Sequence, residues 1–162
     1  MTKSEKLLLI EQFENLSTAF DDVVDLGNDV ILYRPYDDAW SIVEQVVHCL
    51  DFDTANFHRY RWAIVSPGTR VLSFDQSWTA TLNYQSSNIK DAIDLIKIIR
   101  KFMASHLRTT VNDDWKKYSY NFGSEKSFTL EAALPHFINH VGFHRELIDR
   151  NIRLFENENK HV

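Results

Sequence analysis

Three histidines carry the clearest sign of chemistry in this chain of 162 residues. His140 and His144 are four residues apart, so on a helix their imidazoles share one face, with Cβ atoms about 5–6 Å apart. Two ring nitrogens at that separation can reach one metal ion at ~2.0–2.1 Å. A third imidazole, from His48 far upstream, would complete three protein ligands. One coordination position would then stay open, as in catalytic rather than structural metal sites.

The same residues also fit ordinary interior or surface positions without a metal. The chain has 7 histidines, so one pair spaced by four residues arises readily by chance. The residues between the pair are Val141, Gly142 and Phe143, so the glutamate that follows the first histidine in HExxH metallopeptidases is missing. The motif therefore disfavours a metallopeptidase, and it names no catalytic residue.

The composition limits the class of protein. The length predicts a single domain over residues 1–162, and 44% hydrophobic residues suffice for its core. A formal net charge of −5 gives no overall attraction for phosphate backbones, which argues against nucleic-acid binding. No run approaches the ~18 apolar residues of a membrane span, and we expect no signal peptide, because the apolar run 7–10 is too short for one. The single cysteine, Cys49, excludes an internal disulfide, so we expect a cytoplasmic protein.

Periodic apolar residues predict four helices, and only 4 glycines and 3 prolines interrupt the chain. The predicted helices span residues 4–26, 41–65, 88–107 and 129–155. The second begins at a capping box, in which Ser41 and Glu44 satisfy backbone N–H groups reciprocally. Gly27 is expected to end the first helix in a left-handed conformation. Pro135 is expected to kink the fourth helix or restart it near Leu134.

Two connections carry some structure of their own. Residues 66–87 would form an unusually long loop for a compact domain. Apolar residues spaced by four predict a short helix within it: Phe74, Trp78 and Leu82. Residues 108–126 are predicted to be irregular, with one extended segment where aromatic residues alternate: Tyr118, Tyr120 and Phe122. The chain is thus predicted to be an all-α four-helix bundle with a long crossover between helices two and three.

Two segments resemble the signatures of a known family. Residues 40–48, WSIVEQVVH, look like the second-helix signature of the DinB/YfiT-like superfamily. Residues 135–145, PHFINHVGFHR, resemble its last-helix signature, in which histidines recur every four residues. The resemblance covers nearly the whole chain and implies an up-down-down-up bundle that binds a divalent metal, usually nickel or zinc, through three histidines. By motif position these are His48, His140 and His144.

Neighbouring residues have alternative roles. His136 lies on the same helical stripe as the histidine pair but is not one of the family's usual ligands, so we expect it beside the site or simply buried. Glu44 and Asp51 flank His48. Glu44 fits its capping role best, whereas Asp51 fits either a hydrogen bond to a ligand histidine or exposure to solvent.

Cys49 and two aromatic residues are also candidates for the site or the core. Cys49 points about 100° away from His48 around the helix, so we expect a small buried apolar residue rather than a ligand. Trp78 and Tyr84 either wall a pocket or fill the core.

A metal ion with three histidine ligands and one open position supports two reactions. It can lower the pKa of bound water toward 7 and supply hydroxide for hydrolysis. It can equally bind and deprotonate a thiol, which needs no general base from the protein. The resemblance implies the same pair, because the family includes metal-dependent hydrolases and transferases that use low-molecular-weight thiols such as bacillithiol or mycothiol.

We therefore expect a thiol-dependent S-transferase that acts on a small electrophile. A metal-dependent hydrolase and a non-catalytic metal-binding or structural bundle are the alternatives. The expected partners are a small-molecule substrate, a thiol co-substrate and, because family members often pair through their helices, a second copy of the chain in a homodimer. Neither nucleic acid nor a membrane is an expected partner.

Overall fold

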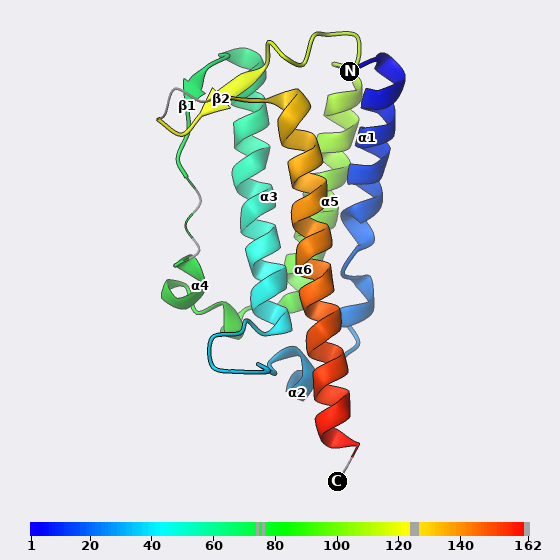
Figure 1. Cartoon of the computed structure of the whole chain (residues 1–162), viewed down its shortest axis with the longest axis vertical. Helices are drawn as coiled ribbons and strands as arrows, with labels where there is room; N and C mark the ends of the chain where they lie inside the picture. Colours follow the sequence, from blue (N-terminus) through cyan, green and yellow to red (C-terminus); the bar gives the residue numbers. More distant parts are fainter. Residues whose placement is uncertain (74, 76, 124–126, 161–162) are drawn as a thin grey trace.

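The computed structural model describes the chain except for residues 74, 76, 124–126 and 161–162. Its body consists of four long helices (Figure 1): α1 (Lys3–Asn15), α3 (Ile42–Val65), α5 (Ile89–Arg108) and α6 (Leu130–Asn159). The shorter elements are α2 (Asn28–Ile31), α4 (Trp78–Thr81), three 3-10 turns (Leu16–Thr18, Asp21–Val23, Tyr84–Ser86) and the strands β1 (Thr69–Arg70), β2 (Ser119–Asn121) and β3 (Ser127–Thr129). Within the described part of the chain, no helix combines the length and apolar character needed to cross a bilayer.

The helix directions confirm the predicted bundle topology. α1 and α6 run away from the end of the bundle that holds the N-terminus, whereas α3 and α5 run toward it (Figure 1). α1 and α3 each pack against α5 and α6. Because α3 and α5 are parallel, a crossover must return the chain to the far end of the bundle, and it does so alongside α3 (Figure 1). The contact between α3 and α6 puts the two histidine-bearing helices side by side.

Local capping sets the beginnings of these helices. The predicted capping box of α3 is present: the Ser41 hydroxyl accepts from the Glu44 N–H, and the Glu44 carboxylate accepts from the Ser41 N–H at 2.8 Å. The Asn88 side chain accepts from the first N–H groups of α5, and the Thr129 side chain accepts from the Ala132 N–H in α6. The second, third and fourth helices therefore begin within about a residue of their predicted starts.

The first helix is shorter than predicted. α1 ends at Asn15, and two 3-10 turns carry the chain on to Val23. The Thr18 hydroxyl donates to the Asn15 carbonyl at 3.2 Å, and the Ala19 N–H bonds to Leu16 in the tighter 3-10 pattern. Threonine here competes with the regular helical hydrogen bonds and tightens the last turn.

The expectation for Gly27 was wrong, and of the two outcomes expected at Pro135, a kink or a restart, the restart does not occur. Gly27 does not stop a helix in the left-handed region; its φ of −63° and ψ of 154° are extended, and it precedes the first turn of α2. α6 passes through Pro135 without the predicted restart. Pro135 removes one backbone hydrogen bond, but Leu134 and Phe137 beside it are fully buried, and this packing holds the helix together.

A small sheet at the end of the bundle was not predicted. Its strand order is β1-β2-β3: β1 runs parallel to the central strand β2 and β3 runs antiparallel to it, so that Tyr120 lies between Thr69 and Phe128. β2 confirms the predicted extended segment. α4 confirms the short helix within the crossover, although Phe74 lies outside the described residues.

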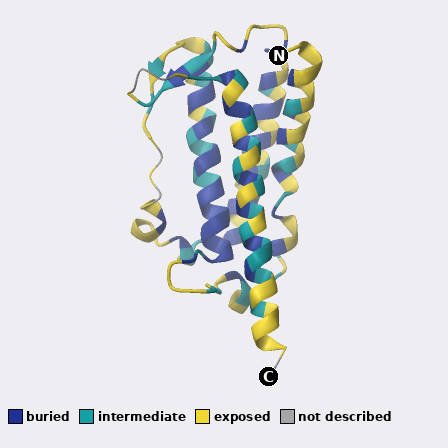
Figure 2. Cartoon of the chain, in the orientation of Figure 1, coloured by how far each residue is buried: buried dark blue, intermediate teal, exposed yellow. Residues whose placement is uncertain are grey.

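A fully buried ion pair lies in the core. Figure 2 shows buried residues along the inward faces of all four long helices. Among them, Arg100 of α5 donates through Nε and Nη2 to the two carboxylate oxygens of Asp53 in α3, at 2.5 and 2.9 Å. Arg100 also lies over the Phe13 ring and donates to the Leu16 carbonyl. This pair therefore ties α3 and α5 to α1.

Removing one member of this pair should destabilise the fold strongly. Asp53→Ala leaves the Arg100 guanidinium buried without its counter-ion, so we expect the free energy of unfolding to fall by about 3–5 kcal/mol. Urea denaturation measures this loss. Glu14→Ala is the matched control, because it breaks the exposed pair with Arg108 and should cost less than about 1 kcal/mol. Similar losses in both variants would contradict the role given to the buried pair.

Candidate metal centre

Two neighbouring helices bring the three predicted histidines together. His48 lies on α3, and His140 and His144 lie one turn apart on α6. One ring nitrogen from each histidine lies within 4.8 Å of those of the other two, and Nε2 of His48 is 3.2 Å from Nε2 of His140. The ring centroids are 4.5–5.1 Å apart. The arrangement is a compact set of imidazole donors, of the kind that zinc and nickel accept.

Burial keeps these imidazoles uncharged. His48 and His144 are buried and His140 is half-buried. Loss of solvent lowers the pKa of His48 to about 4, and it lowers those of His140 and His144 to about 2 and about 3 with a further contribution from neighbouring histidines. All three rings are therefore neutral near pH 7, which is the protonation state that binds a metal.

Surrounding side chains fix the orientation of the rings. The Gln45 side-chain oxygen lies 2.5 Å from Nδ1 of His144. An amide oxygen only accepts, so Nδ1 carries the proton and Nε2 is left as the lone-pair donor. Phe52 stacks on His140 with ring centroids 3.6 Å apart, and Trp40 stacks on His144 at 6.3 Å.

The chemistry of this donor set fits a metal ion. Nδ1 of His140 is buried without a hydrogen-bond partner among the described residues. The three neutral imidazoles face one another, and each has one unprotonated ring nitrogen with a lone pair. A divalent cation binds such lone pairs. His140 and His144 also line a cavity of about 450 Å³, so a fourth ligand could approach from it. The other lining residues are Tyr36, Asp38, Ala39, Trp40, Gln45, Phe143, Leu147 and Arg150.

Comparison with known proteins agrees with this geometry. The family model of the DinB superfamily matches residues 11–148. This chain belongs to the DinB superfamily. It is 23% identical over 146 residues to a Bacillus subtilis (strain 168) protein named "Putative metal-dependent hydrolase YfiT", a match that covers 89% of this chain and 82% of that protein.

A solved structure of YfiT from Bacillus subtilis has the same fold. It superposes with a TM-score of 0.87 at 17% sequence identity and covers 96% of this chain and 90% of its own. That protein is described as a probable metal-dependent hydrolase with an unusual four-helix bundle topology. The likeness confirms the DinB-like four-helix fold that the sequence predicted.

The structure shows which contacts the residues around this DinB-superfamily site make. Glu44 caps α3, as expected, and also accepts from Nε of Arg34 at 3.0 Å. Asp51 accepts a hydrogen bond from the hydroxyl of Tyr84, which is buried in the core, a partner that the sequence did not predict. Cys49 is fully buried, and burial raises the pKa of its thiol, so it is an apolar residue of the core, as expected.

His136 lies beside the site but is exposed, so the alternative of burial was wrong. Its ring centroid is 6.4 Å from that of His140. Reasoning from the sequence missed Gln45 and Phe52, which orient the ligand histidines. Gln45 is three residues before His48 and Phe52 is four after it, so both share its helical face, and that spacing was the available signal.

Substitution of the three histidines should remove bound metal selectively. His48→Ala, His140→Ala and His144→Ala each delete a direct ligand, so we expect at least a 100-fold loss of affinity, more than the 10–100-fold typical of a supporting residue. His136→Ala is the matched control from the same stripe of α6 and should retain its metal. Elemental analysis of protein purified without a histidine tag gives the comparison. Equal metal content in all four variants would refute the assignment.

The depressed pKa values predict a weak pH dependence of metal binding. Three imidazoles with the ordinary pKa of 6.5 would each be about three-quarters protonated at pH 6, and proton competition would lower the affinity roughly 70-fold relative to pH 8. Since the folded pKa values are about 2 to 4, the rings are already neutral at pH 6. We expect a change below about fivefold between pH 8 and pH 6 in titrations with zinc. A loss near 70-fold would contradict it.

Proposed function

We propose that this protein is a divalent-metal-dependent enzyme in which His48, His140 and His144 hold zinc or nickel. The observation that carries the proposal is the convergence of three neutral imidazoles beside a cavity of about 450 Å³. A cavity of that size suits a small-molecule substrate. The relationship to YfiT, itself named for metal-dependent hydrolysis, supports the choice of a metal enzyme over a non-catalytic bundle.

The charge of the site favours an anionic nucleophile. When bound, the metal supplies positive charge that lowers the pKa of a thiol or a water molecule in the cavity. The histidines contribute no negative charge, and Gln45, which holds His144, is a neutral amide. Asp38 is the one carboxylate among the described lining residues, and it is exposed. A thiol route suits this lining because it needs no separate general base, and sulfur is the softer ligand.

We therefore propose transfer of a low-molecular-weight thiol to a small electrophile. The thiolate sulfur would form a bond to an electrophilic carbon, whose leaving group departs with the bonding electrons. The chain's own residues prepare this step. Trp40, Phe143 and Leu147 wall the cavity with apolar surface, and Arg150 presents a cation at the same cavity for an acidic group on either reactant.

Hydrolysis is the second candidate, and the YfiT relationship favours it specifically. Water would take the place of the thiol, and the same three histidines would serve as ligands. The two reactions differ in the nucleophile that reaches the metal, so a spectroscopic test at the metal separates them.

The location of the protein, its type of substrate and its association are also proposals. We propose a cytoplasmic protein that acts on small molecules rather than on nucleic acid or membranes, in keeping with its net charge of −5. A homodimer stays a prediction. It is supported by a stripe of exposed apolar residues on α5, where Leu95, Ile98 and Phe102 are 48%, 64% and 51% exposed.

Cobalt substitution should reveal the nucleophile. We expect a small thiol such as 2-mercaptoethanol to bind the cobalt-loaded protein and produce a sulfur-to-cobalt charge-transfer absorption band, because thiolates coordinate such metals directly. His140→Ala should abolish the band, whereas His136→Ala should keep it. Cleavage of a model ester that stops on chelation, without any thiol-dependent band, would favour the hydrolase instead. Absence of both signals in metal-loaded protein would favour a non-catalytic bundle.

A further inference from the structure

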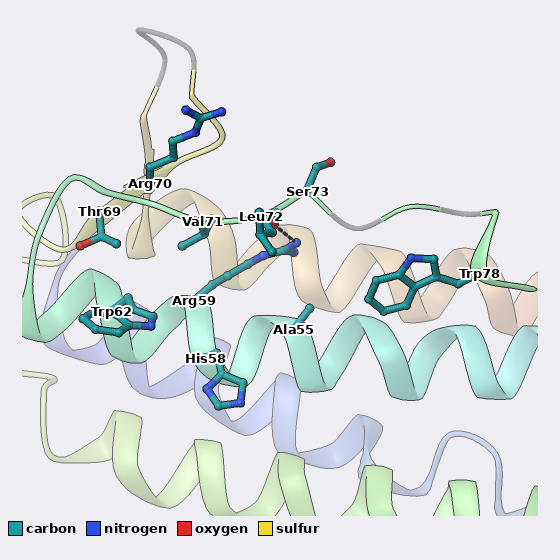
Figure 3. A pocket seen from close by; sticks show the side chains of 10 residues that line it. All are labelled: Ala55, His58, Arg59, Trp62, Thr69, Arg70, Val71, Leu72, Ser73 and Trp78. Atoms are coloured by element: carbon teal, nitrogen blue, oxygen red, sulfur yellow. Dashed lines mark hydrogen bonds between the residues drawn. The ribbon is translucent and has the colours of Figure 1, made fainter. Parts of the chain in front are cut away.

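A second cavity lies on α3, away from His48, His140 and His144. It has a volume of about 440 Å³ and is formed between the helix and the crossover that follows β1 (Figure 3). Ala55 and Arg59 make its floor, Trp62 and Trp78 stand at its two ends, and Leu72 lies above the helix (Figure 3). It shares no lining residue with the histidine cavity. Ala55 follows His48 by about two helical turns, or ~10 Å along the axis.

The cavity contains a buried cation without a matching anion. Arg59 is only 7% exposed, yet the described residues place no carboxylate within ion-pair distance of it. It contacts neutral groups: Nη1 donates to the Asn56 side chain at 3.1 Å, Nη2 donates to the Leu72 carbonyl at 2.8 Å, and the guanidinium lies 5.0 Å from the centre of the Phe122 ring. The other buried arginine, Arg100, has Asp53. A buried guanidinium is costly without a counter-charge, and these two bonds use only two of its five N–H donors.

The rest of the lining selects for a flat apolar ligand. The indoles of Trp62 and Trp78 are 49% and 41% exposed at the two ends of the cavity. Large aromatic side chains that remain in contact with solvent around a concave site are typical of ligand pockets. None of the described lining residues is acidic, in a chain whose net charge is −5. Arg70 lines the cavity too, but its guanidinium points away from α3, so Arg59 supplies the charge inside (Figure 3).

We propose that this cavity is a second binding site, which takes a small aromatic carboxylate. The ring lies between Trp62 and Trp78, and the carboxylate accepts hydrogen bonds from the remaining donors of Arg59. Charge-assisted bonds of a guanidinium to a carboxylate are among the strongest polar contacts in proteins, and here they would supply the missing counter-charge. The site does not depend on the metal or on the reaction proposed for the histidine cavity.

The four tryptophans allow the site to be located directly. Trp62 and Trp78 line this cavity, Trp40 lines the histidine cavity, and Trp115 is buried in the core. We would titrate 2-naphthoate into nitrogen-15-labelled, metal-free full-length protein and follow the indole N–H signals, assigned through single Trp→Phe variants. The expected result is a saturable shift of the Trp62 and Trp78 signals, with the Trp115 signal unchanged.

Matched ligands and variants test the roles of charge and ring. The neutral analogue 2-naphthamide should bind at least tenfold more weakly, since it lacks the charge that Arg59 recognises. Arg59→Met and Trp62→Ala should each weaken 2-naphthoate binding at least fivefold. Arg61→Met is the control, because Arg61 lies on the same helix but stacks over Phe57 and Phe102 outside the cavity.

Two measurements do not depend on whether Arg59→Met folds. Trp62 is half exposed, so Trp62→Ala should fold normally. The comparison of 2-naphthoate with 2-naphthamide uses the wild-type protein. Three outcomes would overturn the proposal: no saturable shift at millimolar 2-naphthoate, equal binding of the amide, or a shift confined to Trp40, which would place the ligand in the histidine cavity.

Discussion

The register between α3 and α6 is the constraint on which the candidate metal centre depends. The helices are antiparallel, and three contacts follow one after another along them: Gln45 with His144, His48 with His140, and Phe52 with Phe137. A slip of one residue in either helix would rotate its side chains by about 100° and separate all three contacts. The apolar packing on both sides of the histidines therefore positions them as much as their own interactions do.

Charge near the three histidines is balanced with little margin. The three histidines are held neutral by burial, and Arg100 is neutralised by Asp53. A divalent ion at the histidines would thus bring an uncompensated positive charge into a poorly solvated site. Such a site favours anions as the additional ligand, which is why a thiolate or a hydroxide is the expected nucleophile rather than a neutral molecule.

The sequence predicted those features whose cause is local. The capping residues Ser41 and Asn88 lie within a few positions of the helices that they begin, so their effect can be read without knowing the fold. The four-residue spacing of His140 and His144 is equally local, whereas His48 was a candidate third ligand that the family resemblance then supported. Knowledge of the fold was needed to bring the three residues to one place.

What the sequence could not predict depends on contacts between distant segments. Asp51 is held by Tyr84, and the strand β1 forms only because β2 lies beside it. The length of α1 depends on whether the Thr18 hydroxyl bonds to the Asn15 carbonyl or the helix continues for another turn. These alternatives differ little in energy, and the spacing of apolar residues does not distinguish them. Continuity of α6 through Pro135 likewise follows from packing of its neighbours in the core.

The parallel arrangement of α3 and α5 has a consequence for how this fold can diversify. It obliges the chain to cross the length of the bundle between these helices, and that segment covers a surface of α3 without taking part in the contact between α3 and α6. Insertions, deletions and substitutions in the crossover can therefore reshape the wall above Arg59 while the histidines keep their register. The face of α3 that meets α6 is held by the register of the histidines, whereas the face beneath the crossover can change without moving that register.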